Sequence, residues 1–322
     1  MINKNILIII LLVLILGAGG YFLYNKFYRQ NPIEQSSQNT QNKEVWQDKG
    51  VAIAGKFADA DLVDLGDDRF RLYYSVEPEV AGNKLELYSS ISTDGINWTK
   101  EEGVRKEFAT FPSVIKLEDG GFRLYFQNAG VIKSALSEDG LSWDDESGIR
   151  IEAIEENLTN IENVGAQTII QLEDKSFLMV YRVMLKVRYS QEVPNDSTQI
   201  LYYATSQDGI SWEKKGLALD SRNSTFNGLI DGAELVKWDP SSTSSGQVQA
   251  RLYFWSYKGI YHINFEKSNF SQEPVFDFSN NPSSQGLYPP NPPGDPTLGK
   301  IQGKWYLFYG QHEKGIYYAV LE

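Results

Sequence analysis

The chain has 322 residues, a formal net charge of −12 at pH 7, two histidines and no cysteine. A chain without cysteine forms neither disulfides nor thiolate sites, and two histidines are too few for a His-rich metal cluster, so no cofactor is expected. Nucleic-acid backbones are bound by clustered Lys and Arg, which makes nucleic acid an unexpected partner for so acidic a chain. Tyr, Phe and Trp supply 13% of the residues, and this favours a sheet-rich fold.

The amino-terminal end carries an apolar run over residues 6–24, close to the roughly 20 residues that a membrane-spanning helix needs. We expect residues 1–29 to be an uncleaved, single-pass membrane anchor, because aromatic residues extend the run past any small-residue cleavage site. A cleaved signal peptide is the alternative. Residues 30–43 are rich in Asn, Gln and Ser, and we expect them to be a flexible linker. The domain that follows is then expected at the cell membrane, on its extracytoplasmic side; basic residues on both flanks leave the orientation open by charge alone.

The phrase Ser-x-Asp-Gly-x-x-Trp occurs three times, at residues 92–98, 137–143 and 206–212. Each copy follows a β-rich run, and Asp-Gly between alternating apolar stretches predicts a hairpin with a type I′ turn, in which both central residues have φ > 0. We expect the Trp to pack between neighbouring units and the Asp to cap the turn. Regular recurrence of one turn indicates stacked copies of one supersecondary unit.

Five strand pairs surround these turns, and their first strands contain Leu62, Val114, Thr168, Leu235 and Thr297. Each pair is followed by a third strand, and four-stranded units repeated around an axis are propeller blades. We therefore predict an all-β fold, a monomeric five-bladed β-propeller over residues 44–322. The fifth unit stops without an outer strand, so residues 45–53 are expected to supply it and close the ring, which removes a bare sheet edge.

Two residue types within the blades are expected to be structural. Arg71, Arg123 and Arg251 recur at one equivalent position of the second strands, which favours a shared structural role over a ligand clamp. His262 lies inside a predicted strand and is likewise expected to be structural.

The strand pattern, the number of units and the phrase Gly294-Asp295-Pro296-Thr297 resemble the five-bladed propeller glycosidases of the arabinanase, xylosidase, levansucrase and invertase type. The resemblance covers residues 44–322. It implies hydrolysis of a glycosidic bond by carboxylates at the blade starts, around a central funnel. In that family an Asp before Pro is the general base, the next blade has an Asp just after the Pro position, and the third has an acid Glu two residues before it.

Aligned with that family, the Pro position of the five blades is held by Ala60, Pro112, Gln167, Ala233 and Pro296. Five carboxylates lie beside this position, and they are the candidate catalytic residues: Asp59, Asp61, Asp231, Glu234 and Asp295. In the best register Asp295 matches the base and Asp61 the second Asp, but Thr110 stands at the acid position. No register completes the triad. Asp231 or Glu234 is then the candidate acid, and turn capping or binding of an axial structural cation or water is the alternative for this set.

The loops between second and third strands are expected to open on the same face as the blade starts. They contain Glu77 and the candidate substrate-binding residues Gln127, Asn128, Arg182, Trp255, Tyr257 and His312. Aromatic platforms beside forked polar groups are typical of sugar sites. Arg182 suits a carboxylate-bearing sugar, and a plain hydrogen-bonded loop residue is the alternative reading of His312.

The predicted function is therefore that of a membrane-tethered, extracytoplasmic glycoside hydrolase-like propeller that acts on a carbohydrate. Asp295 would be the base, Asp61 its modulator, and Asp231 or Glu234 the acid. The first alternative is a non-catalytic surface propeller that binds glycan or protein. A scaffold for other envelope proteins is a third reading, and it predicts an apolar patch on one face in place of an acidic funnel.

Overall fold

The computed structural model describes residues 45–322, except 78–81, 156, 239–247 and 281–287. The expected membrane anchor at 1–29 and linker at 30–43 lie outside the described residues. Among the residues that are described, no helix is long and apolar enough to cross a bilayer. Residues 45–322 form one compact unit.

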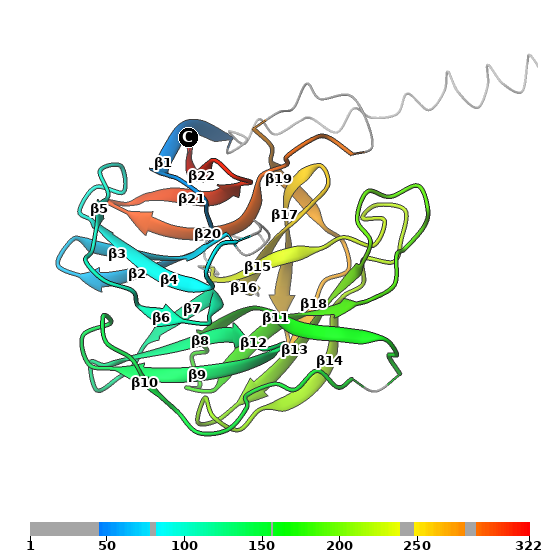
Figure 1. Ribbon diagram of the computed structural model, residues 1–322, viewed down its shortest axis with the longest axis horizontal. Coiled ribbons are helices and arrows are strands. Elements are labelled where there is room, and N and C mark those ends of the chain that lie inside the picture. The colour runs from blue at the N-terminus through cyan, green and yellow to red at the C-terminus, as the bar shows by residue number, and fades with distance from the viewer. Residues whose placement is uncertain (1–44, 78–81, 156, 239–247, 281–287) are drawn as a thin grey trace, which may run out of the picture. The chain divides into compact units, whose positions relative to one another are not determined.

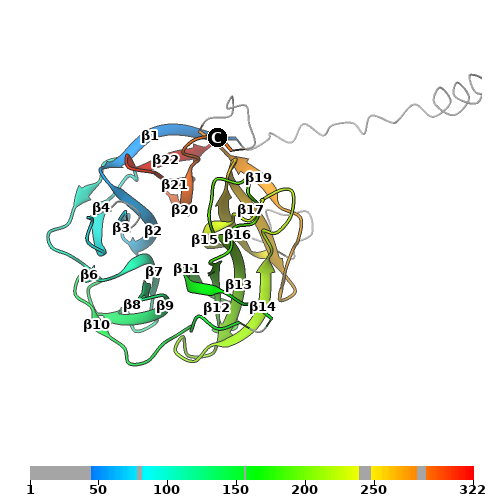
Figure 2. The same ribbon diagram turned by 45° about the vertical axis from the view of Figure 1, so that its right-hand side comes forward.

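This unit consists of five antiparallel sheets arranged as blades around a common axis (Figures 1 and 2). Blade 1 contains β2 (Phe57–Gly66), β3 (Arg69–Val76), β4 (Glu86–Ser92), β5 (Thr99–Lys100) and β6 (Lys106–Glu107). Blade 2 contains β7 (Thr110–Lys116), β8 (Phe122–Asn128), β9 (Val131–Ser137) and β10 (Asp144–Asp145). Blade 3 contains β11 (Ile161–Gln171), β12 (Phe177–Leu185), β13 (Thr198–Ser206) and β14 (Glu213–Leu219). Blade 4 contains β15 (Asp231–Lys237), β16 (Val248–Ser256), β17 (Gly259–Glu266), β18 (Asn269–Phe270) and β19 (Val275–Phe278).

Blade 5 combines the two ends of the domain. It contains β20 (Gly294–Ile301), β21 (Lys304–Gln311), β22 (Gly315–Leu321) and, as its outer strand, β1 (Trp46–Ala54). β1 pairs antiparallel with β22, from Trp46 opposite Leu321 to Ala54 opposite Gly315. The predicted five-bladed propeller and its closure by an amino-terminal outer strand are confirmed.

The apolar core is divided into five main clusters, one between each pair of neighbouring blades. Between blades 1 and 5, for example, the fully buried Leu72 and Tyr74 pack with Phe308 and Ile316. Burial of alternate side chains on both faces of each sheet provides the main driving force for this arrangement.

The repeated Ser-x-Asp-Gly-x-x-Trp phrase forms capped loops. In the first copy, Asp94 Oδ1 accepts hydrogen bonds from the backbone N–H of Ile96 (2.8 Å) and Asn97 (2.7 Å). The other two aspartates, Asp139 and Asp208, accept the equivalent bonds. The cap is thus confirmed, but the type I′ turn is wrong: the glycines have positive φ and the aspartates before them do not. The side-chain cap, not a mirror-image turn, fixes these loops.

Each tryptophan of the phrase packs edge-to-face against the preceding blade, as predicted. Trp143 meets Tyr73 with ring centroids 6.0 Å apart, Trp212 meets Tyr125 at 5.9 Å, and Trp98 meets Phe308 at 5.4 Å. Such aromatic pairs contribute about 0.5–1.5 kcal/mol beyond the area that they bury.

The recurring arginines also join blades. Arg71 donates to the backbone oxygen of Asp139 in the next blade (3.0 Å) and pairs with Glu101 (2.8 Å). Arg123 repeats this with Asp208 and Glu146. Arg251 differs, because its guanidinium lies over the ring of Trp238, 3.6 Å from the centroid. The shared structural role is therefore confirmed for the first two arginines.

His262 is a structural residue, as expected from its place in a strand. It is buried, and its Nδ1 lies 2.7 Å from Asp277 Oδ2. This contact joins β17 to the outer strand β19, so His262 holds the edge of blade 4.

Every innermost strand has the same irregularity near its start. The residue immediately before the aligned Pro position has positive φ in all five blades: Asp59, Phe111, Ala166, Gly232 and Asp295. The pairing register with the second strand shifts at the same place in each blade. These bulges support the alignment of the blade starts and re-aim one side chain per blade. We call these five residues the funnel ring.

Candidate functional site

Below the funnel ring lies a second ring, formed by the residue just after the Pro position of each blade. We call it the axial girdle, and its members are Asp61, Ser113, Thr168, Glu234 and Thr297. Side chains of four of them accept a backbone N–H from an adjacent blade at 2.8–3.2 Å. Because each bond crosses from one blade to another, the girdle joins the inner strands around the axis.

Glu234 completes the girdle through its two neighbours. The Thr168 hydroxyl donates to Oε2 and the Thr297 hydroxyl donates to Oε1, both at 3.1 Å. The same two hydroxyls accept the N–H groups of Leu235 and Leu62. Both oxygens of Glu234 are therefore engaged within the girdle.

Burial changes the protonation of the girdle acids. Burial raises the pKa of Asp61 to about 7, against the opposing effect of the N–H bond from Val114. The pKa of Glu234 is raised well above its usual value, first by burial and then by the negative charge of Asp61. When an acid binds its proton more tightly in the folded protein than in the unfolded chain, the free energy of unfolding falls as the pH rises.

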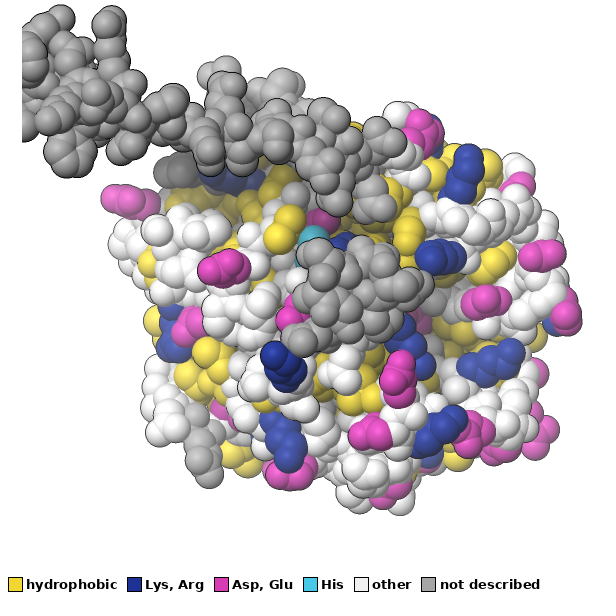
Figure 3. All heavy atoms as spheres, turned by 180° about the vertical axis from the view of Figure 1, so that it is seen from behind, with side chains coloured by type: hydrophobic (Ala, Val, Ile, Leu, Met, Phe, Trp, Pro, Cys, Tyr) yellow, Lys and Arg dark blue, Asp and Glu magenta, His cyan; other side chains and the backbone are white. Residues whose placement is uncertain are grey.

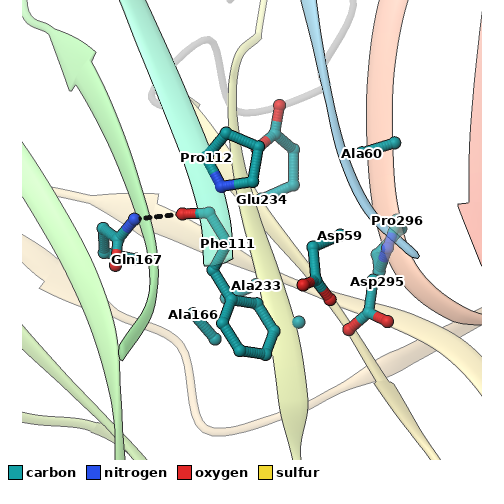
Figure 4. A pocket seen from close by; sticks show the side chains of 11 residues that line it. Asp59, Ala60, Phe111, Pro112, Ala166, Gln167, Ala233, Glu234, Asp295 and Pro296 are labelled. Atoms are coloured by element: carbon teal, nitrogen blue, oxygen red, sulfur yellow. Dashed lines mark hydrogen bonds between the residues drawn. The ribbon is translucent and has the colours of Figure 1, made fainter. Parts of the chain in front are cut away.

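The funnel ring encloses a small pocket on the axis, with room for about one water molecule. Its volume is about 20 Å³, and all five ring residues line it together with Glu234. Figure 4 shows the Asp59 and Asp295 carboxyl groups pointing into the same space, with the ring of Phe111 across from them.

A larger cavity of about 290 Å³ opens beyond this pocket, and we call it the funnel cavity. Three members of the funnel ring, Asp59, Phe111 and Asp295, line both spaces. The remaining lining comes from strand ends and loops of blades 1, 4 and 5, and includes Glu77, Asp231, Trp255, Asn291, Gln311 and His312. The cavity is thus acidic with an aromatic wall.

Asp295 is held in place by its neighbours. The indole N–H of Trp255 donates to Asp295 Oδ1 at 3.1 Å. Gly232 has φ +53°, and a Cβ at that position would collide with Asp295 and approach Trp255 Cδ1 to 2.9 Å. The funnel ring therefore needs glycine in blade 4, because Asp295 occupies the space of a side chain there.

Asp231 is engaged in a buried ion pair. Its Oδ2 lies 2.7 Å from Nη1 of Arg182, and its Oδ1 accepts the N–H of Gly232 at 2.8 Å. Arg182 also donates from Nη2 to Asn163 (3.1 Å) and Gln127 (3.3 Å). Both carboxylate oxygens of Asp231 are therefore engaged by protein groups. Arg182, a candidate substrate-binding residue, joins blade 3 to blade 4 through its pair with Asp231.

Glu77 and His312 face each other at the rim of the funnel cavity. Glu77 lies at the end of β3 and is 4% exposed, whereas the His312 side chain is 49% exposed. Nδ1 of His312 contacts Glu77 Oε1, and Glu77 Oε2 accepts the backbone N–H of Glu313 at 2.8 Å. Figure 3 shows a face of the domain on which a histidine lies among apolar, acidic and basic side chains.

The other predicted binding residues are placed differently. Trp255 and His312 line the funnel cavity, as expected, while Gln127 serves as a hydrogen-bond acceptor for Arg182. Asn128 donates to the backbone oxygen of Phe108 and lines a separate groove at the edge of blades 1 and 2. Tyr257 is buried against Tyr288, with ring centroids 4.7 Å apart.

Phe111 and Asn291 are among the lining residues that were absent from the sequence-based candidates. Phe111 directly precedes Pro112, so the alignment that identified Asp59 and Asp295 also identifies it. Asn291 lies in a long loop that carries no recognisable pattern, and it exchanges hydrogen bonds with the backbone of His312. Within the described part of the chain, no group of three or more acidic or histidine side chains is arranged to hold a metal ion.

Comparison with solved structures identifies the fold. The chain is similar to a thermostable family-43 glycoside hydrolase, with 15% identity and a TM-score of 0.57, covering 84% of this chain and 89% of that chain. It is similar to the β-xylosidase RS223, with 11% identity and a TM-score of 0.56, covering 86% and 95%. It also resembles a structure from the GH130 family of mannoside phosphorylases, described as containing glycoside hydrolases that target β-1,2-mannosidic linkages, with 13% identity and a TM-score of 0.55, covering 83% and 84%.

These similarities establish the fold, that of the five-bladed propeller glycoside hydrolases, and confirm the resemblance seen in the sequence at that level. No family model matches the chain, and no curated protein matches it.

Proposed function

We propose that the propeller binds a carbohydrate in the funnel cavity and hydrolyses a glycosidic bond there. The observation that carries this proposal is the convergence of Asp59 and Asp295 on one cavity, beside Trp255 and on a fold shared with glycoside hydrolases. Carboxylates accept hydrogen bonds from sugar hydroxyls, and an indole ring offers an apolar surface to the sugar face.

Asp295 is proposed as the general base. Its carboxylate accepts a hydrogen bond from Trp255, and it lies at the bulge near the start of its strand. It also directly precedes Pro296, which is the position of the base in the family that the sequence resembles. Asp59, from the neighbouring blade 1, lines the same pocket and is its companion. Two carboxyl groups that share a confined space disfavour simultaneous ionisation, so the pair can divide into a proton acceptor and a hydrogen-bond donor.

Asp61, Glu234 and Asp231 receive other roles in this proposal. Asp61 and Glu234 belong to the axial girdle, where their oxygens bond to neighbouring blades. Asp231 is engaged by Arg182 and Gly232. We assign the first two to holding the blades together and Asp231 to shaping the cavity wall.

The size of the cavity suits a terminal sugar. Small-molecule sites usually enclose roughly 300–1,000 Å³, and the funnel cavity, at about 290 Å³, lies at the lower end of this range. One sugar ring, with the rest of the chain outside, is the substrate size that we propose.

The second candidate function is glycan binding without catalysis. Thr110, the residue at the family's acid position in the best register, has no carboxyl group and lies at the start of β7. A propeller that has kept the cavity and lacks the acid would retain affinity and show no turnover.

The proposed function is tested by hydrolysis of aryl arabinofuranosides, xylosides, galactosides and fructosides by the full chain and by Asp295→Asn. Asn tolerates positive φ, so this change removes the charge and keeps the backbone of Asp295, whose φ is +45°. We expect turnover to fall at least 100-fold. Asp68→Asn is the matched control, because Asp68 also has positive φ (+55°) but is exposed in the turn between β2 and β3.

Turnover that Asp295→Asn leaves unchanged would contradict the assignment of the base. Glycan binding by the wild-type chain with no turnover on any substrate would support the second candidate function.

We also propose that residues 6–24 tether the propeller to the cell membrane, with the propeller on the extracytoplasmic side. The support is the length and apolar character of this run. Membrane fractionation of the full chain, followed by protease treatment of intact cells, tests both points. Recovery of the full chain in the soluble fraction would contradict the tether.

A further inference from the structure

We propose that His312, oriented by the buried Glu77, is the general acid of the site. The inference rests on the proposed hydrolase function and adds a proton donor at the rim of the same cavity. Asp231 is engaged by Arg182 and Gly232, and the girdle acids are engaged by neighbouring blades. His312 lines the same cavity as Asp59 and Asp295, and it is half exposed.

The geometry of the two side chains supports this role. Glu77 contacts Nδ1 of His312 through Oε1, and its other oxygen is fixed by the Glu313 N–H. The His312 backbone N–H donates to Asn291 Oδ1 at 3.1 Å, which anchors the loop from the other side. A carboxylate on one ring nitrogen fixes the orientation of an imidazole and leaves the other nitrogen for proton transfer. Nε2 is therefore the reacting atom of His312.

Several carboxylates lie near His312. Glu77 faces it from the end of β3, and Glu313 Oε1 lies 3.9 Å from Nε2. Glu313 also lies 4.0 Å from Lys56, so a cation shares that carboxylate. Asp59, Asp231 and Asp295 line the same cavity. Among the described residues that line the cavity, His312 is thus the one with an ionisable nitrogen.

Protonated His312 donates the Nε2 proton to the glycosidic oxygen while the bond from that oxygen to the anomeric carbon breaks. The bonding electron pair stays with the leaving-group oxygen, which departs as an alcohol. Water adds to the anomeric carbon, and Asp295 accepts its proton. Solvent then reprotonates His312 and deprotonates Asp295, so both groups return to their starting states.

The test compares leaving groups. Wild type, His312→Gln and Glu77→Gln are assayed on 2,4-dinitrophenyl and methyl glycosides of xylose, arabinofuranose and galactose. Dinitrophenolate is a stable anion and leaves without being protonated, whereas the methyl glycoside needs a proton on its leaving oxygen. We expect His312→Gln to lower kcat/KM for the methyl glycoside about 100-fold or more, and for the dinitrophenyl glycoside by less than about 3-fold.

The pH–rate profile separates an acid from a structural residue. His312→Gln should remove the limb on which the rate falls as pH rises, and Glu77→Gln should move that limb because the positioning carboxylate is lost. Lys314→Gln is the matched control: Lys314 is exposed in the same loop, and its change should leave both substrates and the profile unaffected.

Equal losses on the two leaving groups in His312→Gln, with the profile unmoved, would overturn the acid assignment and leave the proposed hydrolase intact. Absence of turnover by the wild-type chain on every glycoside would overturn both.

Discussion

The funnel ring and the axial girdle are two residues apart on the same five strands, yet their carboxylates are in different environments. Asp59 and Asp295 of the funnel ring line the cavity, and Trp255 fixes the latter. Asp61 and Glu234 of the girdle bond to backbone N–H and hydroxyl groups of neighbouring blades. The bulge between the rings aims one set of side chains into the funnel and leaves the other set between strands.

This difference shows that the position of an acid on the axis does not define its role. A carboxylate whose partners are all protein groups stabilises the ring of blades, and one that lines a cavity can meet a ligand. Variants of the two rings should therefore separate stability from activity.

The largest effect on stability is expected at the ion pair beside the funnel ring. Arg182→Met leaves Asp231 as a buried, uncompensated charge, and we expect a loss of about 3–5 kcal/mol in the free energy of unfolding. The side chains of both partners are at most 10% exposed. Denaturant unfolding of Arg182→Met, Asp231→Asn and the double variant should give non-additive losses. Additive losses would show that the two side chains do not interact.

Gly232→Ala should affect the funnel ring almost as strongly. The new Cβ would collide with Asp295 and crowd Trp255, at a residue whose φ is +53°. We expect a destabilisation of about 2–3 kcal/mol together with loss of turnover. Gly148→Ala is the control for backbone strain alone, because Gly148 has φ +86° and nothing within 4 Å of its ideal Cβ. Equal effects of the two changes would contradict the close approach of Asp295.

Thr168→Val tests the girdle without touching the cavity. The change removes an acceptor from the Leu235 N–H and a donor from Glu234 Oε2. We expect the free energy of unfolding to fall by about 1–3 kcal/mol, while kcat/KM at a temperature where the protein stays folded is unchanged. Loss of turnover in a folded Thr168→Val protein would place the girdle within the site.

The pH dependence of stability should come from the girdle as well. The pKa of Asp61 is raised to about 7 in the folded protein, so its contribution is complete below the unfolded pKa and is lost as pH rises through 7. We expect the free energy of unfolding to fall by about 2 kcal/mol between pH 5 and pH 7. Asp61→Asn imitates the protonated acid, so it should reduce the slope by about this amount, leave the part that comes from Glu234, and be more stable than wild type at pH 8. An unchanged slope in Asp61→Asn would contradict the shift.

Much of the architecture can be predicted from the sequence, because it depends on local repetition. The recurring Trp98, Trp143 and Trp212 and the aligned blade starts predicted the five blades, and the missing last strand predicted closure by residues 45–53, which the structure places at Trp46–Ala54. The turn type was wrong, because the side chain of Asp94 caps a longer loop.

The site is less predictable, because its contacts join distant parts of the chain. Asp231 and Arg182 are 49 residues apart, and Glu77 and His312 come from the first and last blades. No local pattern shows that Arg182 meets an aspartate, or that Asn128 turns away toward Phe108. The sequence shows that the loops carry polar and aromatic residues. Which of these side chains line the cavity depends on tertiary packing.

The separation of the two rings is tested most directly by measuring kcat/KM and the free energy of unfolding for Asp295→Asn and Asp61→Asn side by side. We predict that Asp295→Asn loses turnover at least 100-fold with a stability change within about 1 kcal/mol. Asp61→Asn should keep its turnover within about 3-fold while the dependence of its stability on pH becomes weaker by the share of Asp61. Equal loss of turnover in both variants would contradict the account, because both rings would then belong to one catalytic site.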